Sequence, residues 1–158
     1  MAQTGRDPLD ETEMSAWLAF LRVATQALAQ LDRELQAAHG LTLSDYEILA
    51  FLSEAPERRL QMTELAAKAL VSQSRLTYRV DRLVNEGLVE RVPCESDGRR
   101  VYAVLTKAGL AKLKAAYPSH LEGVRRYVID PPDGADLSAL SRSLCSMQRA
   151  LDGAGRPS

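Results

Sequence analysis

The feature that most restricts the fold is a long stretch without proline or glycine, residues 11–38, in which apolar side chains recur at every seventh position. Two positions of the repeat are apolar, one occupied by Met14, Leu21, Leu28 and Leu35 and the other by Trp17, Ala24, Leu31 and Ala38. This period predicts one long amphipathic helix that ends at His39-Gly40. A seam sustained over several heptads normally packs against another helix rather than a compact core. The first segment therefore needs a helical partner.

The C-terminal segment carries a second seam of this kind. Thr106 can cap a helix that is kinked at Pro118 and broken by the Pro/Gly-rich residues 130–134. In the last helix apolar residues alternate at spacings of three and four. Two such seams are best satisfied by packing on each other and on a second copy of the chain. We therefore expect a homodimer, with dimerisation residues Met14, Leu21, Leu28, Leu137, Leu140, Leu144, Met147 and Leu151.

Between the seams the pattern predicts three short helices. Residues 44–47 (Ser-Asp-Tyr-Glu) form a capping box that begins one helix, which must stop before Pro56. A short helix follows at residues 63–70. Ser72 then caps a third helix over residues 73–86, closed by a glycine.

After this third helix the apolar period changes to two. Residues 88–92 and 101–105 are rich in β-branched and aliphatic side chains, and residues 93–98 between them have turn chemistry. The order short helix, turn, capped helix, hairpin is a winged helix-turn-helix, whose second helix enters the DNA major groove. The expected fold class is mainly α with a small β-hairpin wing (α+β), and with N- and C-terminal helices forming a dimerisation region.

The expected organisation is a single intertwined domain. Residues 11–40 form the N-terminal dimerisation helix, residues 41–106 the winged helix-turn-helix and residues 107–152 the C-terminal dimerisation helices. Residues 1–10 and 153–158 are expected to be disordered tails.

One face of the helix over residues 73–86 is suited to reading DNA. At about 100° per residue, Leu76, Val80, Leu83 and Val84 share one side, and Ser74, Arg75, Tyr78 and Arg82 share the other. Arginine pairs bidentately with guanine, and serine or glutamine reads base edges or phosphates. Gln73 and Ser74 lie in the first turn, which usually meets the bases, and Ser72 with its neighbouring amides suits a phosphate.

The charge of the chain does not by itself indicate a nucleic-acid partner. The formal net charge is −1. Five acidic residues nearly cancel the six arginines between Ser72 and Val101. Binding must therefore depend on where the arginines lie, because a local cluster of cations is all that a DNA-binding face needs.

Taken together, these motifs resemble the MarR (multiple antibiotic resistance regulator) family. The resemblance is carried, in order, by residues 62–66 (MTELA), 75–83 (RLTYRVDRL), 87–91 (GLVER), 97–99 (DGR) and 105–109 (LTKAG). It implies a triangular dimer built from the terminal helices and binding to pseudo-palindromic promoter sites. It also implies a transcription regulator, often a repressor, released from DNA by a small anionic or phenolic ligand or by thiol oxidation.

The resemblance also assigns roles in the wing. Arg99 matches the wing-tip arginine that enters the minor groove, Asp97 would brace it through a salt bridge, and Arg100 would lie close to phosphate. Many members carry arginine directly after the threonine that matches Thr77, whereas this chain has Tyr78, which leaves the operator sequence open. The expected DNA-binding set is Ser72, Gln73, Ser74, Arg75, Thr77, Tyr78, Arg79, Arg82, Asp97, Arg99 and Arg100.

In the family the effector cavity lies between the first, second and fifth helices. Trp17 and Tyr46 come from the first two, although aromatic residues at such positions are more often part of the core. Arg22 is the nearest cation to Trp17 in sequence for a buried anion. The expected ligand-binding set is Trp17, Phe20, Arg22, His39 and Tyr46.

Other functions receive less support. Cys94 and Cys145 have neither disulfide-framework nor zinc-ribbon spacing. Cys94 opens the wing loop, so a redox-responsive regulator is one alternative function. Cys145 is expected in the core. No metal-ligand spacing or catalytic motif is present, so we expect neither a cofactor nor an enzyme. A winged helix used for protein–protein contacts is the other alternative. With no membrane-spanning run and no secretory signal in the sequence, we expect a soluble, cytoplasmic protein.

Overall fold

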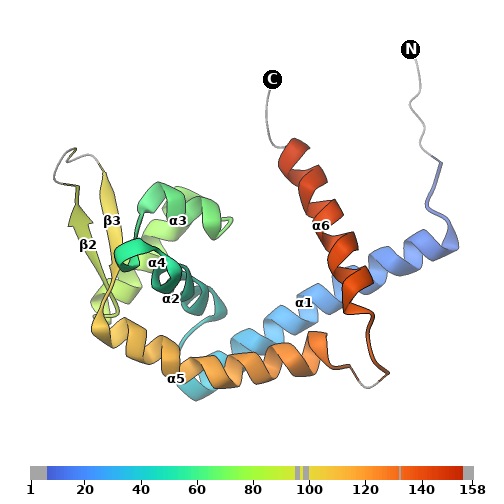
Figure 1. Ribbon diagram of the computed structural model, residues 1–158, viewed down its shortest axis with the longest axis horizontal. Helices are drawn as coiled ribbons and strands as arrows, with labels where there is room; N and C mark the ends of the chain where they lie inside the picture. The colour runs from blue at the N-terminus through green and yellow to red at the C-terminus, as the bar shows by residue number, and fades with distance from the viewer. Residues whose placement is uncertain (1–6, 95–96, 98–99, 132, 155–158) are drawn as a thin grey trace, which may run out of the picture. The chain divides into compact units, whose positions relative to one another are not determined.

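The computed structural model describes residues 7–94, 97, 100–131 and 133–154, and the chain divides into two compact units, with the boundary after His120. The first unit holds α1 (Glu11–His39), α2 (Leu43–Glu54), the 3-10 turn η1 (Pro56–Arg58), β1 (Arg59–Gln61), α3 (Met62–Lys68), α4 (Gln73–Asn85), β2 (Val89–Pro93), β3 (Val101–Leu105) and most of α5 (Lys107–Val124). The second unit holds the end of α5, the π-helical turn η2 (Arg125–Ile129) and α6 (Leu137–Ala154). The expected class, mainly helical with a winged helix-turn-helix, is confirmed (Figure 1).

Helix α1 has the predicted extent, but its apolar seam divides into two parts. It begins at a capping box between Asp10 and Glu13 and ends at Gly40. Near its C-terminal end Leu31 and Leu35 are buried, whereas Leu28 is 53% exposed. The N-terminal part of the seam therefore offers an apolar surface that the rest of the first unit does not cover.

Helix α2 begins at a different capping box from the one predicted. The N-cap is Thr42, whose Oγ1 accepts a hydrogen bond from the Asp45 amide at 3.1 Å, while Asp45 Oδ2 accepts one from the Thr42 amide at 3.0 Å. Ser44 and Glu47 already lie inside the helix. Both segments satisfy the capping pattern, and the carboxylate of Asp45 is also engaged by Arg82, which favours the earlier box.

The wing contains one strand more than predicted. The antiparallel sheet has the order β1-β3-β2, with Leu60 of β1 and Arg91 of β2 both paired with Ala103. Strands β2 and β3 confirm the predicted hairpin. Strand β1 joins directly to α3, so the sheet links the start of the helix-turn-helix to the wing.

The core of the first unit orients α4. Leu76, Val80 and Leu83 of α4 are fully buried, as the helical wheel predicts, and α4 lies beside α3 and β2 (Figure 1). They pack in a cluster with residues from α1, α2, α3, both long strands and α5, including Leu35, Ile48, Leu52, Leu65, Val89, Ala103 and Leu113. Burying this face turns the opposite face of α4 to the surface.

Helix α5 is anchored to the loop before β2. Thr106 caps it as predicted: its Oγ1 accepts from the Gly109 amide at 2.9 Å and donates to the Gly87 carbonyl at 2.8 Å. Gly109 approaches the Leu88 carbonyl so closely that an added Cβ would lie 2.1 Å from its oxygen. The helix runs through Pro118 to Val124.

Helix α6 has the predicted seam but a later end. It continues to Ala154, so Gly153 and Ala154 are helical rather than part of a tail. The seam residues Leu137, Leu140, Leu144, Met147 and Leu151 are all exposed. Cys145 is exposed too, which corrects the expectation of a core cysteine, because α6 turns little of its surface to a core within its own unit. None of the helices in the described ranges is long and apolar enough to cross a membrane.

Candidate DNA-binding interface

The first turns of α4 present the polar side chains predicted to read DNA. Ser72 is the N-cap, and its Oγ accepts from the Arg75 amide at 3.4 Å and lies 3.1 Å from Ser74 Oγ. Tyr78 is 74% exposed. Exposed side chains thus cover this face of the helix: Ser72, Gln73, Ser74, Arg75, Thr77 and Tyr78.

Two arginines of α4 are placed differently. Arg79 is half-buried. Burial raises the pKa of Glu47 on α2, and the charge of Arg79 partly offsets that increase. Arg82 forms an ion pair with Asp45 and donates from Nη2 to Thr42 Oγ1 at 3.2 Å. The wheel placed Arg82 on the DNA-reading face. The structure holds its guanidinium against the buried Asp45 of α2 and leaves 42% of the Arg82 side chain exposed, so a DNA contact by Arg82 stays a prediction.

The described part of the wing loop is closed by backbone and ionic contacts. The Cys94 amide donates to the Arg100 carbonyl at 2.8 Å, and the Arg100 amide donates to the Asp97 carbonyl at 2.9 Å. Arg100 Nε also lies 3.3 Å from Asp97 Oδ2. Arg99 lies outside the described residues, so its minor-groove role and its pairing with Asp97 stay predictions.

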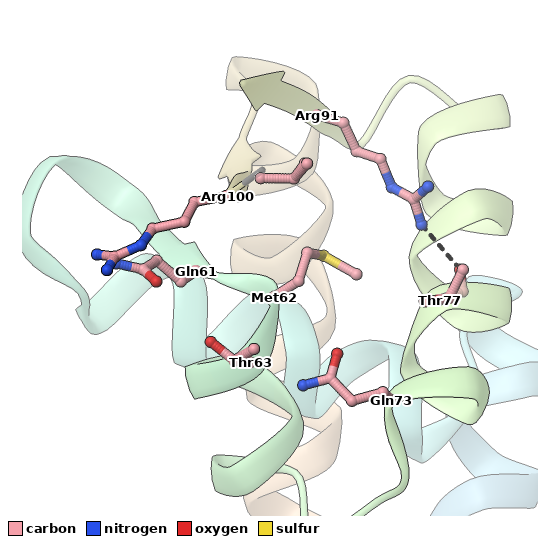
Figure 2. A pocket seen from close by; sticks show the side chains of 8 residues that line it. Gln61, Met62, Thr63, Gln73, Thr77, Arg91 and Arg100 are labelled. Carbon is pink, nitrogen blue, oxygen red and sulfur yellow. Dashed lines mark hydrogen bonds between the residues drawn. The ribbon is translucent and has the colours of Figure 1, made fainter. Parts of the chain in front are cut away.

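Arg91 of β2 joins the wing to α4, a role that the sequence analysis missed. Its Nη2 donates to the Thr77 carbonyl at 3.1 Å (Figure 2). Its Nη1 lies 3.0 Å from Asp81 Oδ1. Alternation along β2 indicates which residues point away from the core, but Thr77 and Asp81 lie on another element. The sequence alone offers no signal for this contact.

A pocket of about 300 Å³ lies between α3, α4 and the wing, and we call it the helix–wing pocket. Figure 2 shows Thr63 of α3 and Gln73 of α4 on facing sides of the pocket. The pocket brings together predicted and unpredicted residues: Gln61, Met62, Thr63, Gln73, Thr77, Arg91, Arg100 and Val101.

The residues predicted to bind a ligand form two groups. Trp17 and Phe20 stack on one another with ring centroids 6.3 Å apart on the exposed part of α1, and Arg22 is also exposed. His39 and Tyr46 instead contact α5. No recorded contact joins the two groups within the described residues.

The second group includes two residues that the sequence analysis did not select. His39 Nε2 lies 2.7 Å from Ser119 Oγ, and the Tyr46 ring lies 4.2 Å from the His120 ring between centroids. Burial raises the pKa of Tyr46, with smaller contributions from Tyr117 and Glu54, and burial lowers the pKa of His120. We call Tyr46 of α2, Ser119 and His120 of α5, and His39 at the end of α1 the α2–α5 cluster.

Comparison with known proteins identifies the family. The MarR family model matches residues 39–100. AbsC, a MarR family transcriptional regulator from Streptomyces coelicolor, is 40% identical, with a TM-score of 0.86 over 94% of this chain and 99% of AbsC. Sco3205 from the same organism, a MarR family regulator solved in complex with DNA, is 35% identical, with a TM-score of 0.84 over 99% of this chain and 95% of Sco3205.

Curated relatives of the chain are transcription regulators as well. The transcriptional repressor YetL of Bacillus subtilis is 33% identical over 56% of this chain, and the match spans about half of YetL (53%). The homoprotocatechuate degradative operon repressor of Escherichia coli is 30% identical over 71% of this chain and 74% of that repressor. A winged helix with an exposed polar α4 and likenesses that extend over nearly the whole chain lead to one conclusion: the chain belongs to the MarR family of DNA-binding transcription regulators.

Proposed function

We propose that this regulator is a homodimeric, cytoplasmic repressor that binds a pseudo-palindromic promoter site and is released by a small anionic or phenolic ligand. The observation that carries the proposal is the exposed polar face of α4, directed outward because Leu76, Val80 and Leu83 are buried on the other side. Base-contacting side chains on one helix, with a wing beside it, are what recognition through two adjacent grooves requires.

The exposed apolar seams support a second copy as partner. Trp17, Leu21 and Leu28 on α1 and Leu144 and Met147 on α6 are all exposed in the single chain. Covering such side chains would stabilise a dimer by roughly 25 cal/mol for each Å² of apolar surface removed from water. A symmetric dimer presents two copies of α4, which matches a two-fold symmetric site.

The α2–α5 cluster supports the ligand part of the proposal. Its imidazoles, hydroxyl and phenol can hydrogen-bond a phenolate or carboxylate, and Tyr46 and His120 offer aromatic faces for a ring. One relative represses a homoprotocatechuate degradative operon, and homoprotocatechuate is both a phenol and an acid. A small hydroxylated aromatic acid is therefore the first class of ligand to test.

The experiment is a gel shift with the promoter region of the gene itself, compared with scrambled DNA of the same length at near-physiological salt. We expect a preference for the promoter of at least tenfold and loss of the shifted band with an active aromatic acid. Arg99→Ala should weaken promoter binding tenfold or more, at about 1–3 kcal/mol for a good groove contact. Equal affinity for scrambled DNA would instead favour a protein–protein module, and release by peroxide that is abolished in Cys94→Ser would favour redox control.

A further inference from the structure

The helix–wing pocket lies where a DNA strand has to pass. A protein that places α4 in the major groove and its wing in the adjacent minor groove has one sugar–phosphate strand between those two elements. The pocket separates α4 from the wing, and α3 forms its remaining side (Figure 2). A strand crossing this gap would bring a phosphodiester to the pocket.

The lining of the pocket suits an anion that only accepts hydrogen bonds. Donors come from two guanidinium groups, two amide side chains and two hydroxyls: Arg91, Arg100, Gln61, Gln73, Thr63 and Thr77. None of the described residues in the lining carries a carboxylate. A phosphodiester has a negative charge and no donor, so this chemistry complements it.

Arg91 is held in place before any DNA arrives. Its contacts with the Thr77 carbonyl and the Asp81 carboxylate engage two of the five N–H groups of the guanidinium. The same contacts link β2 to α4 and so set the width of the gap. A donor already fixed in position loses less conformational entropy on binding.

We propose that the helix–wing pocket binds one phosphodiester of the DNA strand that passes between α4 and the wing. Arg91 is its charged donor, and Thr63 and Gln73, which face one another across the pocket, are its neutral donors. The inference rests on the proposed binding of promoter DNA and adds the backbone group that sets the register of α4. Because every nucleotide carries the same phosphate, this contact contributes equally to operator and scrambled DNA.

The first test measures the salt dependence of binding. Arg91→Gln removes one cation, so the slope of log K against log salt should decrease by about one unit, for operator and for scrambled duplex alike. Lys114→Gln, on an exposed position of α5, is the matched control for charge and should leave the slope unchanged. An unchanged slope in Arg91→Gln would overturn the proposal.

Arg91→Gln also removes the contacts that join the wing to α4, so a second set of variants tests phosphate binding without changing those contacts. Thr63→Ala and Gln73→Ala leave the Arg91 contacts intact, and each should weaken both duplexes by about two- to tenfold. Duplexes with one neutral methylphosphonate linkage at each position then locate the contact. Among the linkages that weaken wild-type binding, we expect one per half-site to have no further effect in Gln73→Ala or Arg91→Gln.

The outcomes distinguish the two proposals. If the wild-type protein binds promoter and scrambled DNA equally, the proposed function fails, whereas the salt slope of Arg91→Gln on either duplex still tests the phosphate assignment. If it binds the promoter but no methylphosphonate position couples to Gln73 or Arg91, only the phosphate assignment is overturned. Inorganic phosphate at constant ionic strength should compete weakly, and competition as strong in the Arg91→Gln variant as in the wild type would also contradict the assignment.

Discussion

Arg82 of α4 is ion-paired with Asp45 of α2, whose side chain is only 2% exposed. The same carboxylate accepts from the Thr42 amide and so caps α2. One buried group therefore fixes both the start of α2 and the position of α4 relative to it. The pair bears on DNA binding through the orientation of α4.

Replacing Arg82 by glutamine should lower stability without changing the ionic part of DNA binding. We expect the free energy of unfolding to fall by about 1–3 kcal/mol, since Asp45 would remain buried with its charge uncompensated; the exposure of Arg82 keeps this below the full value for a buried pair. Urea unfolding measures the loss. If Arg82→Gln instead reduced the slope of log K against log salt, as expected for Arg91→Gln, Arg82 would also contact DNA.

A charge in the α6 seam should disrupt the proposed dimer. Leu144→Asp would place a carboxylate against apolar surface, which is costly without a partner, so we expect monomers at micromolar concentration. Ser146→Asp adds the same charge on the opposite side of α6 and is the control. Light scattering after size-exclusion chromatography gives the mass of each. A Leu144→Asp dimer as stable as the wild type would refute the interface.

Gly109→Ala should destabilise the first unit even though alanine favours helices. Its Cβ would lie 2.1 Å from the Leu88 carbonyl oxygen, so α5 must move away from the loop before β2. We expect a loss of about 1–3 kcal/mol in the free energy of unfolding. Gly153→Ala, where an added Cβ meets nothing within 4 Å, should be neutral or stabilising by up to about 1 kcal/mol. Thermal unfolding of the two variants compares them directly.

Stability should decrease as the pH falls below 6.5, the ordinary pKa of histidine, because burial lowers the pKa of His120 in the folded chain. In that range the unfolded chain takes up the proton before the folded one does, which favours unfolding. His120 Nδ1 makes no hydrogen bond within the described residues, so no contact offsets this effect.

His120→Phe should reduce the pH dependence. Urea midpoints at about pH 7.5 and about pH 5.5 should differ less in this variant than in the wild type. His39→Gln removes the other imidazole and serves as the control. The raised pKa of Glu47 acts in the opposite direction and is common to all three proteins, so it cancels in the comparison. An equal pH dependence in His120→Phe and the wild type would contradict the assignment.

Local patterns were sufficient to predict most elements and the outward face of α4. The heptad repeat of α1, the Ser72 cap, the left-handed Gly87 after α4 and the period-two strands each depend on residues close together in sequence. Such signals act through backbone geometry and solvent exposure, which neighbouring residues determine. The polar face of α4 follows from the same periodicity, because burying one side exposes the other.

The tertiary structure decided the features that depend on contacts between residues far apart in the sequence. Strand β1 is three residues long and exists because β3, about forty residues later, supplies its hydrogen bonds. The choice of Thr42 and Asp45 over Ser44 and Glu47 as the cap, and the placement of the Arg82 guanidinium against α2, follow from one ion pair across 37 residues. The helix–wing pocket and the contact of Tyr46 with His120 likewise join separate elements. Pairing of this kind depends on how helices and strands pack, which a periodicity in sequence does not encode.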